Sequence, residues 1–233
     1  MEKTQAQILR HHGGDGDHAR KMITESYDRR HDIEFWEFWN AQMATCIAKD
    51  DTLLDLGAGT GQFVGDLTLR YPHNLVLGIE AADYMLAAQE QLPENGRIIK
   101  DDLNEPKANI AQEQVAVVMA NMLIHELPQP INLFKAVYRW LKPGGRFCII
   151  DLVRQPLADY LEHKYPEADP FNKEVKREEI EDVFEHFLEH NRYHADDILY
   201  MLTAVGFTVI ESTPLKGGRF VRIVVEKKDY RAE

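Results

Sequence analysis

The chain has 233 residues, of which 44% are hydrophobic and 28% charged, proportions that are typical of a soluble globular protein. It carries 27 Lys and Arg against 39 Asp and Glu, which gives a formal net charge of −12. The acidic excess is present in residues 1–50, 51–150 and 151–233 alike. Proteins that bind nucleic acid neutralise phosphates with a basic surface, so this charge disfavours a nucleic-acid partner.

The sequence shows no sign of export, of a membrane span or of a disulfide framework. Cys46 and Cys148 belong to no CxxC motif, which makes a reduced compartment the default. Residues 1–10 lack the apolar core of a signal peptide, and the longest mainly apolar run, Val115–Ile124, has about half the length of a membrane span. We therefore expect a cytoplasmic protein with no membrane partner.

The first 50 residues predict an arm and a helical cap. Residues 11–18 read His-His-Gly-Gly-Asp-Gly-Asp-His, and three glycines leave the geometry of any metal ligands unspecified, so we expect a solvated arm and predict no metal site. From Ala19 to Ala48 the pattern is helical. Trp36 and Trp39 lie on one face of that helix, which favours core packing over an aromatic substrate box.

Strand and helix signals alternate from residue 51 to residue 153. The short apolar segments that we expect to be strands are Thr52–Leu56, Leu75–Glu80, Arg97–Lys100, Val115–Ala120 and Arg146–Val153. The segments that we expect to be helices are Gln62–Tyr71, Tyr84–Gln91 and Pro130–Leu141, the last ended by Pro143-Gly144-Gly145. This alternation, with short turns, predicts a cofactor-binding core made of a parallel sheet with helices on both faces.

The alternation of strand and helix signals ends after residue 153. Residues 154–194 predict a helical lid, inserted where it can cover the ligand-binding end of the sheet and rich in His and Tyr. Residues 195–233 predict a closing helix, Ala195–Val205, and a β-hairpin of Phe207–Thr213 and Phe220–Lys227. We therefore predict one α/β domain over residues 1–233, a doubly wound, seven-stranded, mostly parallel Rossmann-like sheet with an N-terminal helical cap and a lid.

The strongest chemical signal is the segment Asp55-Leu56-Gly57-Ala58-Gly59-Thr60-Gly61, where a strand passes into a helix. Glycines at such a turn let a ligand approach the bare backbone. Asp55 ends a buried strand, and a buried acid needs a partner, which suits a positively charged ligand. A dinucleotide fingerprint would place its third glycine at position 62, which is Gln62, so this segment disfavours a nicotinamide-dependent oxidoreductase.

A second acid follows at the end of the next strand. Glu80 lies 23 residues beyond Gly57, close to the spacing at which an acid accepts hydrogen bonds from both ribose hydroxyls. The alternative is an acid that is merely exposed at a strand end. Together with the glycine segment, Glu80 favours a ligand that carries a ribose.

From Asp51 to Val153 these motifs resemble the class I S-adenosylmethionine-dependent methyltransferases. The resemblance implies that the loop of Gly57, Ala58, Gly59 and Gly61 passes along the methionine and ribose of this cofactor, with Asp55 near its amino group. It implies that Glu80, followed by Ala81, binds the ribose diol. The acid that contacts the adenine amino group falls at Asp101 or Asp102, and the next residue, Asp102 or Leu103, lines the ring; both registers stay open.

The same resemblance points to the acceptor side of the site. The segment from Asn121 to Leu127 leads from the methionine end of the cofactor toward the acceptor, and Asn121 is expected to contact the cofactor. His125 is a candidate general base, or else a histidine that is hydrogen-bonded to the backbone or the cofactor. Tyr27 would cover the cofactor from the N-terminal helices, unless it packs at the surface. Asp151 faces either solvent or the acceptor.

The implied function is transfer of a methyl group from S-adenosylmethionine to a nitrogen or oxygen, less so a sulfur or carbon, of a small molecule by direct displacement, which yields S-adenosylhomocysteine. Arsenic as acceptor is disfavoured, because such enzymes rely on three or more cysteines. The alternatives are a methyltransferase acting on tRNA or protein, a nucleotide-dependent oxidoreductase and a catalytically silent cofactor-binding subunit. We expect a monomer or a homodimer.

Overall fold

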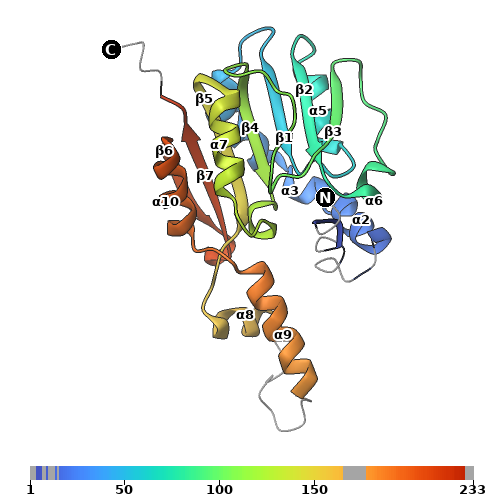
Figure 1. The fold of residues 1–233 in the computed structure, drawn as a ribbon, viewed down its shortest axis with the longest axis vertical. Helices are drawn as coiled ribbons and strands as arrows, with labels where there is room; N and C mark the ends of the chain where they lie inside the picture. The colour runs from blue at the N-terminus through green and yellow to red at the C-terminus, as the bar shows by residue number, and fades with distance from the viewer. Residues whose placement is uncertain (1–3, 7–8, 10–13, 15, 165–176, 229–233) are drawn as a thin grey trace.

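A computed structural model of the chain describes residues 4–6, 9, 14, 16–164 and 177–228, and its centre is one seven-stranded sheet (Figure 1). The strand order is β3-β2-β1-β4-β5-β7-β6. The strands span β1 Thr52–Leu56, β2 Leu75–Glu80, β3 Gly96–Lys100, β4 Val115–Asn121, β5 Leu141–Leu152, β6 Thr208–Leu215 and β7 Phe220–Glu226.

The topology confirms the predicted doubly wound sheet. The pairs from β3 to β5 are parallel, whereas β7 is antiparallel to both β5 and β6 and lies between them. The strand order reverses beside β1, because the chain runs outward through β2 and β3 and then crosses to β4. A ligand crevice in such a sheet lies outside the carboxyl ends of the strands at this reversal.

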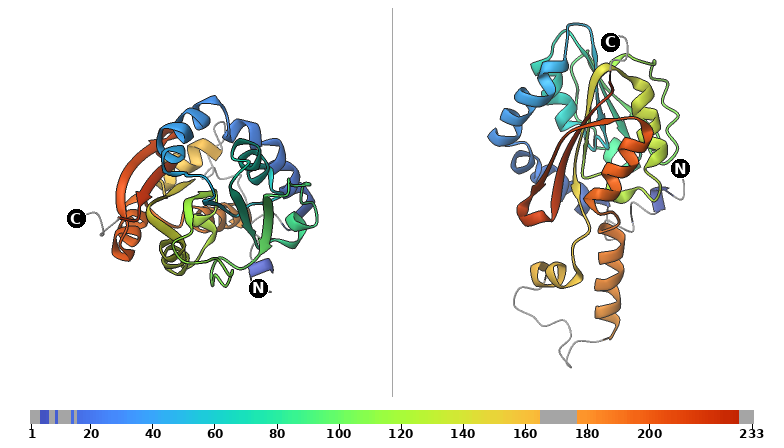
Figure 2. Two further views of the ribbon diagram at one scale, coloured as in Figure 1. Left: turned by 90° about the horizontal axis from the view of Figure 1, so that it is seen from above. Right: turned by 90° about the vertical axis from the view of Figure 1, so that its left-hand side faces the viewer.

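Helices cover both faces of the sheet (Figure 2). On one face α7 (Ile131–Trp140) and α10 (Ala195–Val205) pack through Phe134, Val137 and Leu202. On the other face α5 (Gln62–Arg70), α4 (Ile33–Phe38) and the π-helical turn η1 (Trp39–Met43) pack through Trp39 and Leu67. None of the described helices has the length and apolar character needed to cross a bilayer.

The N-terminal helical region is divided into short pieces. It consists of α2 Gly16–Glu25, α3 Tyr27–Arg30, α4, η1 and the 3-10 turn η2 Ala44–Cys46. The break before α4 has a local cause, because the Asp32 carboxylate accepts a hydrogen bond from the Phe35 amide at 3.0 Å and caps a new helix. Trp39 is buried in the core, as its spacing predicts. In the predicted arm of residues 11–18, residues 11–13 and 15 lie outside the described residues.

Two predicted boundaries are wrong. The helix expected over Tyr84–Gln91 is the single turn α6, Asp83–Leu86, and the chain then leaves the helical path as the Glu90 amide donates to the Thr60 carbonyl oxygen at 2.9 Å. The turn expected at Pro143-Gly144-Gly145 lies inside β5, which already begins at Leu141. A shift of register between β4 and β5 and a positive φ of 74° at Gly144 accommodate it.

The segment predicted as a lid is an arm made of two helices, α8 Leu157–Lys164 and α9 Arg177–His190. The arm starts at the carboxyl edge of the sheet and extends away from it (Figures 1 and 2). Tyr160, Leu161 and Phe187 form a small apolar cluster between its helices. The base of the arm thus lies at the carboxyl edge of the sheet, while its helices do not fold over the sheet, and its part as a lid over a ligand stays a prediction. Residues 165–176, which complete the predicted segment, lie outside the described residues.

Candidate functional site

The glycine loop after β1 is fixed to β2 by its backbone. The amides of Gly57 and Ala58 both donate to the Ile79 carbonyl oxygen, at 2.8 and 3.0 Å. Gly57, Gly59 and Gly61 have φ values of 72°, 56° and 94°, in the left-handed region that favours glycine. The loop can therefore turn sharply at the end of a buried strand and start α5 directly at Gln62.

Two of these glycines serve different purposes. A Cβ built on Gly61 would lie 2.9 Å from Cδ1 of Ile98, so this glycine allows close packing inside the protein. A Cβ built on Gly59 would meet no atom of the described residues within 4 Å. Gly59 therefore borders open space at the carboxyl edge of the sheet, where bare backbone can contact a ligand.

The Glu80 carboxylate is held rigidly by three backbone amides. Its Oε2 accepts a hydrogen bond from the Gly59 amide at 2.7 Å, and its Oε1 accepts from the amides of Ala81 and Ala82 at 2.8 and 2.7 Å. Burial raises the pKa of Glu80, and the three amide donors oppose that rise. Since a carboxylate offers about four acceptor positions, Glu80 keeps capacity for a ligand hydroxyl beside the glycine loop.

Asp55 is a buried acid without a hydrogen-bond donor among the described residues. Its side chain is at the end of β1 and the residue is 5% exposed. Burial and then the nearby Glu80 carboxylate raise the pKa of Asp55 to about 8, while the Arg30 guanidinium lowers it. A second cation next to Asp55 would therefore stabilise its ionised form. This is the environment in which the amino group of a ligand would be favourable.

The acids after β3 have separate environments. Asp101 is buried, and its Oδ2 accepts hydrogen bonds from the amides of Lys107 and Ala108 at 2.7 and 2.6 Å, which closes the following loop. Asp102 is half-buried and accepts from the Thr4 hydroxyl at 2.5 Å and from the Asn104 amide at 3.0 Å. Leu103 is buried in the apolar core. Asp101 is thus engaged by the loop itself, whereas Asp102 is the more exposed of the two.

Tyr27 is the first residue of α3 and contacts α5. Its hydroxyl donates to Oδ2 of Asp66 at 2.6 Å and its ring stacks on His31 with centroids 4.2 Å apart. Burial, followed by Asp66 and Asp55, raises the pKa of the Tyr27 hydroxyl. The structure therefore joins Tyr27 to α5, the helix that follows the glycine loop, and its contact with a cofactor stays a prediction.

The turn after β4 is built around Asp151, a wholly buried residue near the end of β5. Asp151 Oδ2 accepts hydrogen bonds from the amides of Leu123, at 3.0 Å, and Ile124. Its Oδ1 lies 2.5 Å from Nδ1 of His125. Asp151 therefore faces neither solvent nor an acceptor, the two options that the sequence leaves open; it holds the turn and orients the imidazole.

His125 is enclosed by two carboxylates. It is 4% exposed, and its Nε2 lies 3.2 Å from Oε1 of Glu126. Burial alone would lower the pKa of His125, but Asp151 and then Glu126 raise it to about 10. An imidazole that keeps its proton at neutral pH does not suit the task of a general base. The geometry agrees with the alternative, in which His125 is hydrogen-bonded within the protein. The role of His125 as a general base stays an untested prediction.

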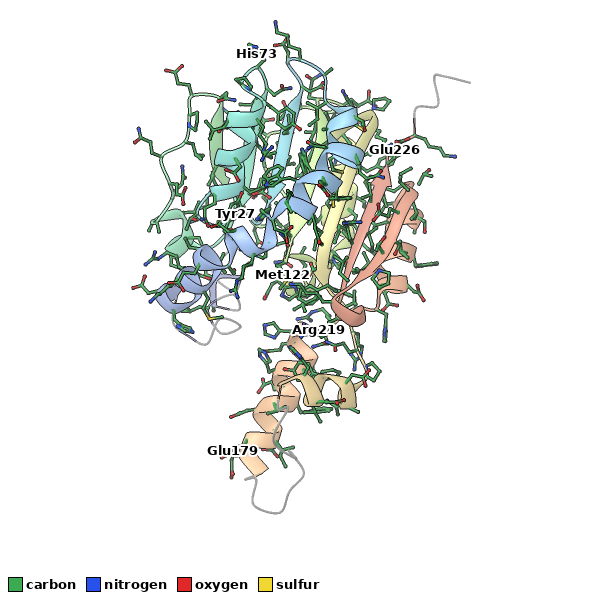
Figure 3. The ribbon with its side chains drawn as sticks, turned by 180° about the vertical axis from the view of Figure 1, so that it is seen from behind. Tyr27, His73, Met122, Glu179, Arg219 and Glu226 are labelled. Carbon is green, nitrogen blue, oxygen red and sulfur yellow. The ribbon has the colours of Figure 1, made fainter. Side chains whose placement is uncertain are left out.

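Sequence reasoning missed two features of this turn. Met122, which follows Asn121 at the end of β4, has a φ of 59°, a strained conformation for a residue with a side chain. Figure 3 shows Met122 at the end of the sheet from which the arm projects. The second feature is that His190 at the end of α9 lies beside Glu126, with 3.9 Å between Nε2 and Oε1. The positive φ leaves no signal in the sequence, and the contact joins residues far apart in the chain.

Comparison with known proteins agrees with this geometry. Residues 54–149 match the family model described as a methyltransferase domain. Over 106 residues the chain is 32% identical to phosphoethanolamine N-methyltransferase 1 of Triticum aestivum, covering 42% of this chain and 20% of that protein. Over 125 residues it is 31% identical to an arsenite methyltransferase of Halobacterium salinarum, covering 49% of this chain and 30% of that one. The chain thus spans less than a third of the length of these two curated relatives.

The fold matches over a longer stretch than the sequence. The structure of Haemonchus contortus phosphoethanolamine N-methyltransferase 2 in complex with S-adenosyl-L-methionine superposes with a TM-score of 0.67. The match covers 97% of this chain and 60% of that one, at 13% identity. Residues 54–149 thus match a methyltransferase domain, and the chain as a whole has the fold of an S-adenosylmethionine-binding methyltransferase.

Proposed function

We propose that this chain binds S-adenosylmethionine at the carboxyl edge of β1, β2 and β4 and transfers its methyl group to a small molecule. The observation that carries the proposal is the arrangement of Glu80, Asp55 and Gly59. A rigid carboxylate and a buried acid without a hydrogen-bond donor flank a stretch of bare backbone that borders open space. These groups match a ligand that carries a diol and an amino group.

Each residue has a defined part in that binding. Glu80 would accept hydrogen bonds from the two ribose hydroxyls, Ala81 would follow it along the ribose, and Asp55 would neutralise the amino group. The loop of Gly57, Ala58, Gly59 and Gly61 would lie along the ribose and methionine, with Asn121 at the methionine end. Asp102, the half-buried acid, is better placed than Asp101 for the adenine amino group, with Leu103 toward the ring. Tyr27 would close the site from α3.

The activated methyl group comes with the cofactor, so the protein need only align the acceptor for an in-line displacement. An amine acceptor in its neutral form needs no base before it attacks. This agrees with a His125 that is enclosed by Asp151 and Glu126 and holds its proton. We infer that His125 positions the turn after β4, and that a base, if an oxygen acceptor needs one, is another group.

The acceptor that the site favours is a nitrogen or oxygen of a small molecule. Asp55, Glu80 and Glu126 gather at this edge, and an amine or a hydroxyl fits such a surface better than a phosphate chain does. The net charge of −12 argues in the same direction against tRNA. A protein acceptor, a sulfur or a carbon remains a lesser alternative.

Cofactor binding is tested by calorimetry with S-adenosylhomocysteine. We expect saturable binding that weakens by about 1–3 kcal/mol in Glu80→Ala, the cost of a lost charged hydrogen bond. Glu94→Ala, which removes an exposed acid, is the matched control and should bind as the unmodified protein does. Binding of NAD without binding of S-adenosylhomocysteine would instead establish the oxidoreductase alternative.

Transfer is tested with methyl-labelled S-adenosylmethionine and a panel of amines, hydroxy compounds, thiols, bulk tRNA and protein. We expect label in a small amine or hydroxy compound and none in tRNA. Label in tRNA or protein would overturn the acceptor class. Tight cofactor binding with no labelled product from any acceptor would favour the silent cofactor-binding subunit.

A further inference from the structure

Three side chains from two distant parts of the chain converge at the base of the arm. His125 and Glu126 belong to the 3-10 turn η3 (Ile124–Glu126) after β4, and His190 ends α9. One ligand atom of each, the two imidazole nitrogens and a carboxylate oxygen, lies within 4.8 Å of the other two. Nε2 of His125 lies 3.2 Å from Oε1 of Glu126, and Nε2 of His190 lies 3.9 Å from the same oxygen.

Both imidazoles are oriented through their other nitrogen. Nδ1 of His125 faces Asp151 Oδ1 at 2.5 Å, and Nδ1 of His190 faces the His186 carbonyl oxygen at 3.1 Å. A carboxylate and a carbonyl can only accept, so each Nδ1 carries its proton. The Nε2 atoms of both rings therefore face Glu126, and a metal ion that binds there takes the place of the proton that His125 otherwise holds.

Two imidazole nitrogens and a carboxylate oxygen therefore converge on one point at the base of the arm. A histidine whose Nδ1–H donates to a carboxylate or a backbone carbonyl, with Nε2 turned to a common point, is the usual arrangement around a bound metal ion. Ligand atoms about 2.0–2.2 Å from a tetrahedral Zn²⁺ lie about 3.4 Å apart. The separation between His125 and Glu126 already matches that value, and a small movement of α9 would bring His190 to it.

We propose that His125, Glu126 and His190 form a site for a divalent transition-metal cation, with Zn²⁺ as the best match to two imidazoles and one carboxylate. Three protein ligands leave at least one coordination position for water or an oxygen or nitrogen of another molecule. The bound ion would fasten the last residue of α9 to the turn after β4, and so fix the base of the arm. This site is independent of whether the chain transfers methyl groups.

The experiment measures metal binding directly in the full chain, produced without a polyhistidine tag and stripped with chelator. Zn²⁺ is added and bound metal is determined by equilibrium dialysis with elemental analysis, with Co²⁺ absorption in the visible region as a second readout. We expect one equivalent of Zn²⁺ per chain and a Co²⁺ spectrum of low-coordinate N and O ligands. Single variants His190→Gln and Glu126→Gln should lose at least about 100-fold in affinity and lose that spectrum.

His73→Gln is the matched control, because His73 is exposed and lies at the opposite end of the sheet from the arm (Figure 3). It should bind Zn²⁺ as the unmodified chain does. His190 and Glu126 are partly exposed at their side chains, 14% and 15%, so both variants are expected to keep their circular dichroism and their melting temperature in chelator. Absence of stoichiometric Zn²⁺ in the unmodified chain would overturn the proposal. Unchanged affinity in both variants would overturn it as well, and would direct attention to the N-terminal histidines.

Discussion

At the scale of single residues, the carboxyl edge of the sheet gathers two acids at a cost in stability. Asp55 and Glu80 end neighbouring parallel strands, and each carboxylate is almost wholly buried. Glu80 is compensated by three amides, whereas among the described residues Asp55 is compensated by the electrostatic influence of Arg30 and by no hydrogen-bond donor. A binding site that is set to receive a cationic ligand is expected to be destabilising while it has none.

This leads to a prediction for Asp55→Asn. In the unfolded chain Asp55 releases its proton near 3.8, whereas in the folded protein burial and Glu80 raise its pKa to about 8. The folded state binds more protons between these values, so its stability falls as the pH rises from about 4 to about 8. Asn cannot ionise and avoids that fall, so we expect Asp55→Asn to raise the unfolding free energy at pH 8 by about 1–3 kcal/mol.

Denaturant unfolding of the ligand-free protein at pH 5 and pH 8 measures this effect. The gain of Asp55→Asn should be smaller at pH 5, and its affinity for S-adenosylhomocysteine should be lower at both. Asp28→Asn, at an exposed position on α3, controls for the substitution itself and should change neither quantity. A loss of stability in Asp55→Asn at pH 8 would show that the Asp55 carboxylate is stabilising.

At the scale of elements, each loop after a parallel strand is fixed by a different device. The loop after β1 depends on left-handed glycines, and the turn after β4 depends on a carboxylate from β5 that collects backbone amides. The first device leaves the loop surface bare for a ligand. In the second device, Asp151 accepts hydrogen bonds from the backbone amides of the turn. This holds the charged side chains of the turn in a fixed position.

Gly59 and Gly61, the second and third glycines of the loop after β1, should respond differently to alanine. Gly59→Ala projects a methyl group into open space, so we expect a weaker affinity for S-adenosylhomocysteine with a stability loss of about 1 kcal/mol from the positive φ. Gly61→Ala also meets Ile98, so its loss of stability should be larger. Thermal unfolding and calorimetry on both variants make the comparison; equal effects on stability would contradict the different surroundings of the two glycines.

Asp151→Asn tests the turn after β4. The amide keeps the shape of the side chain but presents an N–H group to backbone donors and removes the buried partner of His125. We expect the unfolding free energy at pH 7 to fall by about 3 kcal/mol, as when a buried ion pair is broken. Asp159→Asn, on the exposed side of α8, is the control. A loss below about 0.5 kcal/mol would mean that the turn holds without the carboxylate.

At the scale of the whole molecule, the chain is a compact sheet domain with a projecting arm. The two ends of the arm meet where the Arg154 amide donates to the Tyr193 carbonyl oxygen at 2.7 Å. The base is further held by the Arg192 side chain, which donates to the His125 carbonyl oxygen at 3.3 Å. The small cluster inside the arm is separate from the main apolar clusters of the sheet.

We therefore expect the sheet domain to fold without the arm. When residues 157–190 are replaced by a short Gly-Ser linker, the chain should unfold in one cooperative transition. It should bind S-adenosylhomocysteine within about twofold of the full chain, because Glu80, Asp55 and the glycine loop are untouched, and we expect its methyl transfer to be reduced. Calorimetry and the labelled-methyl assay separate these outcomes; loss of cofactor affinity would show that the arm contributes to the cofactor site.

The strands of the sheet and the position of the glycine loop can be predicted from local sequence. Regular spacing between short apolar runs predicts parallel strands, and local motifs such as Asp55 to Gly61 depend only on residues that are adjacent in the chain. The predicted end of a helix was wrong where a contact with a distant residue ends it. At α6 the Glu90 amide donates to the Thr60 carbonyl oxygen and does not take part in a longer helix. The sequence could not assign separate roles to Asp101 and Asp102. Two adjacent acids look alike in sequence and differ only in the groups that surround each side chain in the folded protein.

The organisation of the end of β4 depends on contacts between segments that lie far apart in the chain. Asp151, His125, Glu126 and His190 come from three segments, and neither the turn of amides around Asp151 nor the convergence of the two imidazoles has a signal in sequence spacing. The direction of the arm is likewise set by packing at its base. Local sequence fixes which elements form and which backbone turns are possible, whereas the electrostatic environment of a buried side chain depends on every element packed against it.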